Sequence, residues 1–550
     1  MLRLTWVQPE DLVGHELRQA AQDGREPAAL AAVERRWSAV GGRPAPARAG
    51  ASPAAPDPAL RALARDLLDE LAALPSALAA DEPTDLRAIR ATCPDWPTRT
   101  TPAGPRRRST VPPADAADGG TAGGAASQNG PAAEYDGHRP TDGAARPDAV
   151  RHGSPGHAGS ADGAGPAGAA GAGEARLVAR GGRGPGPAAP APRSPEAQRS
   201  VLHAGWLGRA AGCVLGKPVE KLTLDGIRAI ARATGNWPLR TWFTEVGLPA
   251  DIAAAHPWNR RSRTTSLAET IDGAPEDDDL NYPLLNLLLL RRHGRAFGTA
   301  DVAQLWLDEL PAGRTFTAER VAYRNLLAGI EPPDTATHHN PFREWIGAQI
   351  RADVFGWTNP GDPGTAAELA HRDAVLSHTA NGVYGAMFAA AVVAAAAGGG
   401  TDVHGCLRAG LAVVPPRSRL AEAVRFGIAE AAGADRAPEA FDAVVDRLHA
   451  RYGPDHHWVH VLPNAALLAA ALTHADGDFS ASICRVVSGG WDTDSNGATA
   501  GSVAGLLAGS AEAIPAHWTA PLKNRLATTV AGLDGIGFDA LATLTLEASA

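Results

Sequence analysis

Two clusters of carboxylates in the second half of the sequence could carry metal-dependent chemistry. Glu276–Asp279 precedes a leucine-rich segment, and Asp492–Ser495, which reads Asp-Thr-Asp-Ser, precedes a glycine-rich one. Adjacent carboxylates repel one another unless they are solvated or bound to a cation, and buried ones need a partner. Their oxygen atoms suit Mg²⁺, Mn²⁺ or Ca²⁺ better than zinc. Each cluster alone could also be a solvated cap at the positive end of a helix dipole, whereas two clusters in one pocket would suit two metal ions.

Two series of glycines predict that two helices touch along their backbones. The series are Gly205, Gly208, Gly212 and Gly216, and Gly497, Gly501, Gly505 and Gly509. On a helix, such spacing gives one continuous face without side chains. Each glycine costs a helix about 1 kcal/mol relative to alanine, so this pattern is favourable only if another backbone packs closely against it. The alternative is chance spacing in a glycine-rich chain.

The elements that must position these residues are predicted to be helices. Residues 198–550 contain a leucine run in Asn281–Arg292 and an alanine-rich run in Val383–Ala397, while alternating β-branched runs are nearly absent, which argues against a sheet. We therefore expect one all-α domain there. Residues 1–95 are predicted to form a small helical N-terminal module that packs or docks, with an unknown partner. Residues 96–197 are mostly glycine, alanine and proline and are predicted to be a disordered linker.

Composition excludes several classes of protein. The net charge of −9 argues against non-specific nucleic-acid binding. Four scattered cysteines without a CxxC pair indicate reduced thiols in a cytoplasmic protein and neither a disulfide framework nor a zinc site. We expect no secretory signal, because Met1–Leu12 lacks a long apolar core, and no membrane span, because no window of about 18 strongly apolar residues exists. A monomer is the default expectation.

Three segments, in this order, resemble the ADP-ribosylglycohydrolase family, the all-α hydrolases related to the dinitrogenase reductase-activating glycohydrolase. They are the glycine-rich Gly212–Glu220, the acidic Glu276–Asp279 and the late motif Gly489–Asn496, and the resemblance extends from about Ala197 to Ile536. It implies two Mg²⁺ ions, with Mn²⁺ as the alternative, that hold the distal ribose of ADP-ribose through its hydroxyl groups.

The resemblance also implies roles for individual residues. The metal ligands would be Asp277, Asp278, Asp279, Asp492, Asp494 and Ser495. The register of the first cluster is ambiguous by one, so Asp278 is the firmest ligand of that cluster. Glu220 matches the family's mobile glutamate near the scissile bond, although a lone glutamate after a proline is by default a surface residue; Glu220 and Asp278 are the candidate catalytic residues.

The sequence departs from the family pattern at three points, which indicate a divergent branch. The threonine of the family's Thr-Asp-Asp motif is absent from Glu276–Asp279, Trp491 is inserted into the late motif, and Cys213 stands where many members have aspartate. The substrate could therefore differ from a standard arginine-linked or serine-linked one.

A polar segment before the alanine-rich helix supplies candidate substrate-binding residues, His378, Asn381 and Tyr384. Their alternative role is to cap the helix and satisfy core hydrogen bonds. Arg343 and Arg351 could meet a pyrophosphate, or form salt bridges at the surface instead.

The predicted function is metal-dependent hydrolysis of an N- or O-glycosidic bond to ADP-ribose on a protein or small molecule. One alternative is a catalytically silent ADP-ribose binder or scaffold. Another is an all-α enzyme with an aspartate-rich Mg²⁺-diphosphate site of the terpene-synthase kind, which Glu276–Asp279 fits only loosely. Intact acidic clusters favour the enzyme over a silent relative, which could lose its carboxylates freely.

Overall fold

The computed structural model describes residues 7–43, 57–97, 193–259 and 261–549. Most of the predicted linker lies outside these residues. Within the described ranges the secondary structure is helical, with three isolated β-bridges and no strand. The all-α prediction is therefore confirmed.

The helices before the predicted linker are α1 (Pro9–Gln22), α2 (Pro27–Ala39), α3 (Pro58–Ala73) and α4 (Leu86–Thr92). The helices after it are α5 (Pro195–Gly216), α6 (Leu224–Ala233), α7 (Ala250–Ala255), α8 (Asp278–His293), α9 (Thr299–Glu309), α10 (Thr317–Leu327), α11 (Asp353–Trp357), α12 (Pro363–Ala374), α13 (Ala380–Gly398), α14 (Val403–Leu411), α15 (Arg419–Ala432), α16 (Phe441–Tyr452), α17 (Val461–Ala475), α18 (Phe479–Ser488), α19 (Thr493–Ala508), α20 (Ala516–Thr519) and α21 (Phe538–Ala548). Short 3₁₀ turns include η1 (Lys217–Val219), directly after α5, and η5 (Ile346–Arg351).

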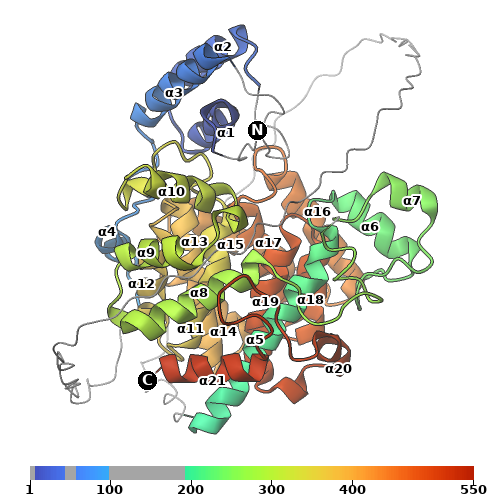
Figure 1. Ribbon diagram of the computed structural model, residues 1–550. Helices are drawn as coiled ribbons and strands as arrows, with labels where there is room; N and C mark the ends of the chain where they lie inside the picture. Colours follow the sequence, from blue (N-terminus) through green and yellow to red (C-terminus); the bar gives the residue numbers. More distant parts are fainter. Residues whose placement is uncertain (1–6, 44–56, 98–192, 260, 550) are drawn as a thin grey trace, which may run out of the picture. The chain divides into compact units, whose positions relative to one another are not determined.

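Helices α5 and α19 pack against each other along their glycine faces (Figure 1). Gly208 lies against the backbone carbonyl of Gly501, and Gly212 lies against that of Gly497. A Cβ atom added to either glycine would come far closer to that carbonyl oxygen than the 3.0 Å that real Cβ atoms keep. The close packing predicted from the glycine spacing is confirmed, and it brings the C-terminal end of α5 beside the N-terminal end of α19.

Helix α13 is the apolar core helix of the domain. It is long and apolar enough to cross a membrane, but 89% of its most apolar window is buried inside the protein. It packs against α11, α12, α14 and η5. Its alanines allow this close packing on several sides, because they add little bulk between neighbouring helices.

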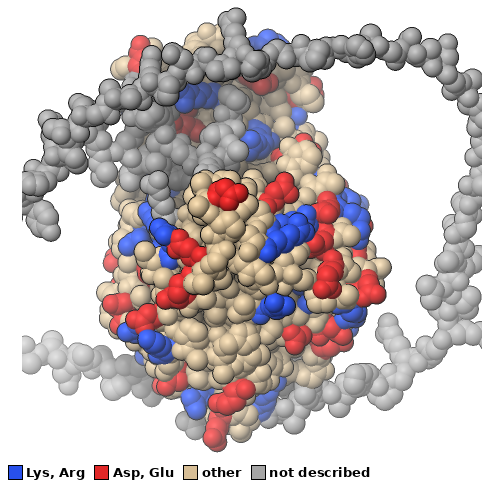
Figure 2. Space-filling model, turned by 90° about the vertical axis from the view of Figure 1, so that its right-hand side faces the viewer, with Lys and Arg blue, Asp and Glu red and all other residues tan. Residues whose placement is uncertain are grey.

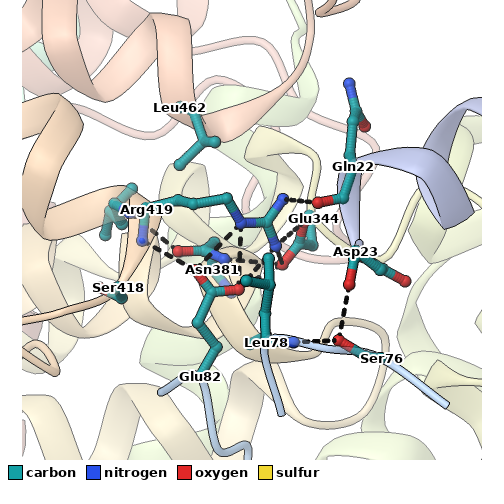
Figure 3. A network of polar contacts seen from close by, with 12 residues as sticks. Gln22, Asp23, Ser76, Leu78, Glu82, Glu344, Asn381, Ser418, Arg419 and Leu462 are labelled. Carbon is teal, nitrogen blue, oxygen red and sulfur yellow. Dashed lines mark hydrogen bonds and ion pairs between the residues drawn. The ribbon is translucent and has the colours of Figure 1, made fainter. Parts of the chain in front are cut away.

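The described N-terminal helices pack against the helices that follow the linker, and both parts fall within one compact unit. Arg343 pairs with Glu16 and Asp23 of the α1 region at 2.8 and 2.5 Å. Figure 3 shows a second contact, in which the guanidinium of Arg419 pairs with Glu82 at 2.7 Å and Glu344 at 2.9 Å. The N-terminal helices are therefore held to the rest of this chain by ion pairs whose carboxylates are buried.

The charged side chains on the surface are mixed in sign. On the face drawn in Figure 2, lysines and arginines alternate with aspartates and glutamates. Charged side chains at the surface also form ion pairs, such as Arg263 with Glu245 at 2.5 Å.

Candidate metal centre

Three segments meet where α5 ends and where α8 and α19 begin. Asp277 caps α8, because its Oδ1 accepts a hydrogen bond from the backbone N–H of Asp279 at 2.9 Å. The Ser495 hydroxyl donates to Asp279 Oδ2 at 3.2 Å and so joins α19 to α8. The Thr493 hydroxyl donates to the carbonyl of Gly216 at 2.8 Å and joins α19 to α5. The two acidic clusters therefore lie together, as the sequence predicted.

The gathered carboxylates carry more negative charge than nearby cations compensate. Burial, followed by the neighbouring carboxylates, raises the pKa values of Asp278, Asp279 and Asp492 well above their usual range. Burial and the charge of Glu220 raise the pKa of Asp494 to about 7. A divalent cation would relieve this repulsion and keep the carboxylates ionised.

Asp279 carries an atom that a cation would satisfy. The residue is 2% exposed, and its Oδ1 is buried without a hydrogen-bond partner. The guanidinium of Arg209 lies 3.7 Å from this oxygen, but Arg209 pairs more closely with Asp353, at 2.7 Å. Because buried polar atoms are rarely left unpaired, the donor set fits a hard divalent cation.

Lys217, in η1, also lies within this cluster. Its ammonium forms an ion pair with Asp277 Oδ2, and its side chain is 9% exposed. Burial alone would raise the pKa of Asp277, but the charge of Lys217 outweighs it and holds that pKa below its usual value. The sequence analysis missed this residue, although it belongs to the Gly212–Glu220 motif and is one of three lysines in the chain.

Cys213 lies on the same side of the cluster, one helical turn before Lys217. Ligand atoms of Cys213, Asp277 and Asp279 all lie within 4.8 Å of one another. Burial, and then the charge of Asp277, raises the pKa of the Cys213 thiol well above its usual value. The thiol is therefore neutral at pH 7.

Glu220 borders the carboxylates and is held by two neighbours. Its Oε2 accepts a hydrogen bond from the Asn259 side chain at 2.7 Å, and its Oε1 pairs with Lys221 at 2.7 Å. Its side chain is 16% exposed, so Glu220 stands at the edge of the buried cluster. This is a suitable place for a group that exchanges protons, but the catalytic role of Glu220 stays a prediction.

A turn supported from two sides presents Asp492. Asn464 of α17 accepts hydrogen bonds from the Asp492 backbone N–H at 3.1 Å and from the Asn496 amide at 2.7 Å. Trp491 has a φ of +58°, which is strained for a bulky residue, and its ring stacks on His449 with centroids 4.1 Å apart. Asn464 and His449 carry no local sequence signal, since each is an ordinary residue within a helix.

The predicted substrate-binding residues are buried and engaged elsewhere. The Asn381 amide donates to Glu344 at 2.8 Å, His378 Nδ1 pairs with the Ser377 hydroxyl at 2.8 Å, and the Tyr384 hydroxyl donates to the carbonyl of Pro83. These contacts are the ones expected if the segment caps the helix and satisfies hydrogen bonds in the core. A role in substrate binding stays a prediction.

Together these features define an all-α protein with a buried carboxylate centre at the ends of two glycine-packed helices. Residues 194–546 match the family model of the ADP-ribosylglycohydrolases, so this chain belongs to that family, and the resemblance seen in the sequence is confirmed. A solved chain of an ADP-ribosylglycohydrolase-related protein complex is similar over 64% of this chain and 100% of its own length, with 20% identity and a TM-score of 0.40. No curated protein sequence matches the chain.

Proposed function

We propose that this protein hydrolyses a glycosidic bond to ADP-ribose at a divalent metal centre, with Mg²⁺ or Mn²⁺ as the ion. Membership of the ADP-ribosylglycohydrolase family supports the reaction class. The observation that carries the metal centre is the buried Asp279 Oδ1, which has no hydrogen-bond partner, within a group of mutually repelling carboxylates. The substrate would be an ADP-ribosylated protein or small molecule.

The residues that would hold the metal are Asp278, Asp279, Asp492, Asp494 and Ser495. When bound, the metal supplies a Lewis acid that orients and polarises hydroxyl groups of the substrate. Positive charge develops on the ribose in the transition state of glycoside hydrolysis, and the buried carboxylates would stabilise that charge. Carboxylates without a bound cation would instead hold protons and lose this effect.

Glu220 would move the proton in this reaction. A carboxylate oxygen at the edge of the cluster can take a proton from the attacking water or give one to the leaving group. The Asn259 amide holds Oε2 at 2.7 Å and so leaves Oε1, beside Lys221, as the oxygen that exchanges the proton. This assignment predicts that Glu220→Gln slows turnover with little effect on metal binding.

The test is release of ADP-ribose, measured by chromatography, from arginine-linked and serine-linked ADP-ribosyl peptides with Mg²⁺, with Mn²⁺ and with EDTA. We expect metal-dependent release that Asp492→Asn abolishes. Asp308→Asn, at an exposed aspartate that accepts a hydrogen bond from Gln304 at 2.8 Å, is the matched control and should retain activity. Full activity of Asp492→Asn, with an unchanged circular-dichroism melt, would refute the metal assignment. ADP-ribose binding by titration without turnover of any substrate would favour the silent binder instead.

A further inference from the structure

We infer that Lys217 supplies one positive charge of the carboxylate centre itself, so that the centre binds a single divalent ion on the side of Asp279, Asp492 and Asp494. This inference rests on the proposed function only in that the centre binds metal. It also resolves the ambiguous register of Glu276–Asp279, because it assigns Asp277 to the lysine and Asp278 and Asp279 to the metal.

The first step is that both oxygen atoms of Asp277 already have a partner. Its Oδ1 accepts the capping hydrogen bond from the Asp279 N–H at 2.9 Å, and its Oδ2 pairs with the Lys217 ammonium. Both partners are fixed: the N–H by the first turn of α8, and the ammonium by a side chain that is 9% exposed. A metal ion on Asp277 would have to displace a buried ammonium from its carboxylate, which is strongly unfavourable.

The second step is that the face of α5 beside Asp277 is unsuited to a further cation. Cys213 and Lys217 are four residues apart, on one side of the end of α5, and present a thiol and an ammonium. Ligand atoms of Cys213, Asp277 and Asp279 lie within 4.8 Å of one another. A divalent ion bound among them would lie close to the ammonium and would be repelled by it.

The third step is that the other carboxylates have fewer cations beside them than negative charges. Among the described residues, Asp278, Asp492 and Asp494 form no ion pair with a lysine or arginine within 4.0 Å. Asp279 Oδ1 is buried without a hydrogen-bond partner, and its only ion pair among the described residues is the long one with Arg209, at 3.7 Å, while Asp279 Oδ2 accepts from the Ser495 hydroxyl. Lys217 forms its ion pair with Asp277 alone, so the negative charge that it leaves uncompensated is shared by Asp278, Asp279, Asp492 and Asp494, where it suits one divalent ion.

The test is the number of Mn²⁺ ions bound per chain, counted by the electron paramagnetic resonance signal of free Mn²⁺ in titrations of the purified full chain without substrate. We expect one ion for the wild type and two for Lys217→Met, because methionine keeps the apolar stem but frees Asp277. Lys217→Arg retains the charge and should bind one. Lys523→Met removes the same charge from an exposed lysine paired with Asp272, and it should also bind one. Asp279→Asn should weaken Mn²⁺ binding at least tenfold.

The number of ions bound to the wild type can by itself refute the inference, so the test does not depend on whether the variants fold. Two ions bound to the wild type would refute the role of Lys217 and leave the proposed hydrolase intact. One ion in both the wild type and a folded Lys217→Met variant would show that Lys217 does not limit the number of ions. No binding at all would refute the metal centre, whereas the peptide assay decides separately whether the chain is a hydrolase.

Discussion

Replacing single glycines of the contact between α5 and α19 with alanine should lower the free energy of unfolding by amounts that depend on which atoms the new Cβ meets. In Gly212→Ala, the new Cβ would overlap the carbonyl oxygen of Gly497, which is backbone and cannot rotate away. Overpacking of this kind typically costs about 1–3 kcal/mol and sometimes more. Alanine returns about 1 kcal/mol through its higher helix propensity. Because the obstacle is backbone on both helices, we expect the upper end of the range, a net loss of about 2 kcal/mol or more.

Two further variants calibrate this expectation. At Gly205 the nearest atoms to an added Cβ are side-chain atoms of Leu506 and Trp357, at 3.0–3.3 Å, so Gly205→Ala should cost clearly less. At Gly313 nothing lies within 4 Å, and Gly313→Ala should be neutral. Urea denaturation followed by circular dichroism measures all three. A Gly212→Ala midpoint equal to that of Gly313→Ala would refute the claim that backbone contact between α5 and α19 organises the domain.

The remaining predictions concern the N-terminal contact, pH and metal. Arg419→Ala should destabilise the chain by about 3–5 kcal/mol, because it leaves two buried carboxylates, Glu82 and Glu344, without their cation; faster proteolysis of the N-terminal helices and a lower denaturation midpoint would show it, and an unchanged midpoint would contradict it. Burial, and then the charge of Arg18, lowers the pKa of His15 to about 3. The unfolded chain therefore binds the extra proton between about pH 6.5 and pH 3, and stability should fall by about 2 kcal/mol from pH 7 to pH 5 on account of His15. His15→Phe should flatten that part of the pH dependence, and an unchanged slope would count against the assignment. Mn²⁺ at one hundred times its dissociation constant should stabilise the wild type by about 2.7 kcal/mol, seen as a higher melting temperature that Asp279→Asn loses.

The parts of the site that the sequence predicted are those encoded by local spacing. Glycines four residues apart define one helix face whatever surrounds it, so the contact between α5 and α19 was predictable. The two acidic clusters were predictable for the same reason, since each is a short run that heads a helix. The glycine contact aligns the end of α5 with the start of α19, but the meeting of the two clusters also needs α8 beside them, which the hydrogen bond from Ser495 to Asp279 provides.

The parts that could not be predicted depend on pairs of residues far apart in the chain. Arg419 and Glu82 are separated by 337 positions. In the sequence, neither residue can be distinguished from the chain's other arginines and glutamates. The ion pair of Lys217 could not be predicted until α8 is placed beside η1, because its partner Asp277 belongs to a different segment. The hydroxyl of Tyr384, a candidate substrate-binding residue, meets the carbonyl of Pro83, which the sequence did not place near α13.

The N-terminal helices and the carboxylate centre are connected through three hydrogen bonds and the backbone segments that join them. Gln19 of α1 donates to the Glu344 side chain at 2.8 Å, and the backbone carbonyl of Glu344 accepts from the N–H of Val461 at 3.1 Å, at the start of α17. One turn later, Asn464 accepts from the Asp492 N–H at 3.1 Å. The segment that α1 contacts therefore anchors the start of α17, and the first turn of α17 holds the Asp492 turn. The N-terminal helices thus form part of the frame that positions the centre.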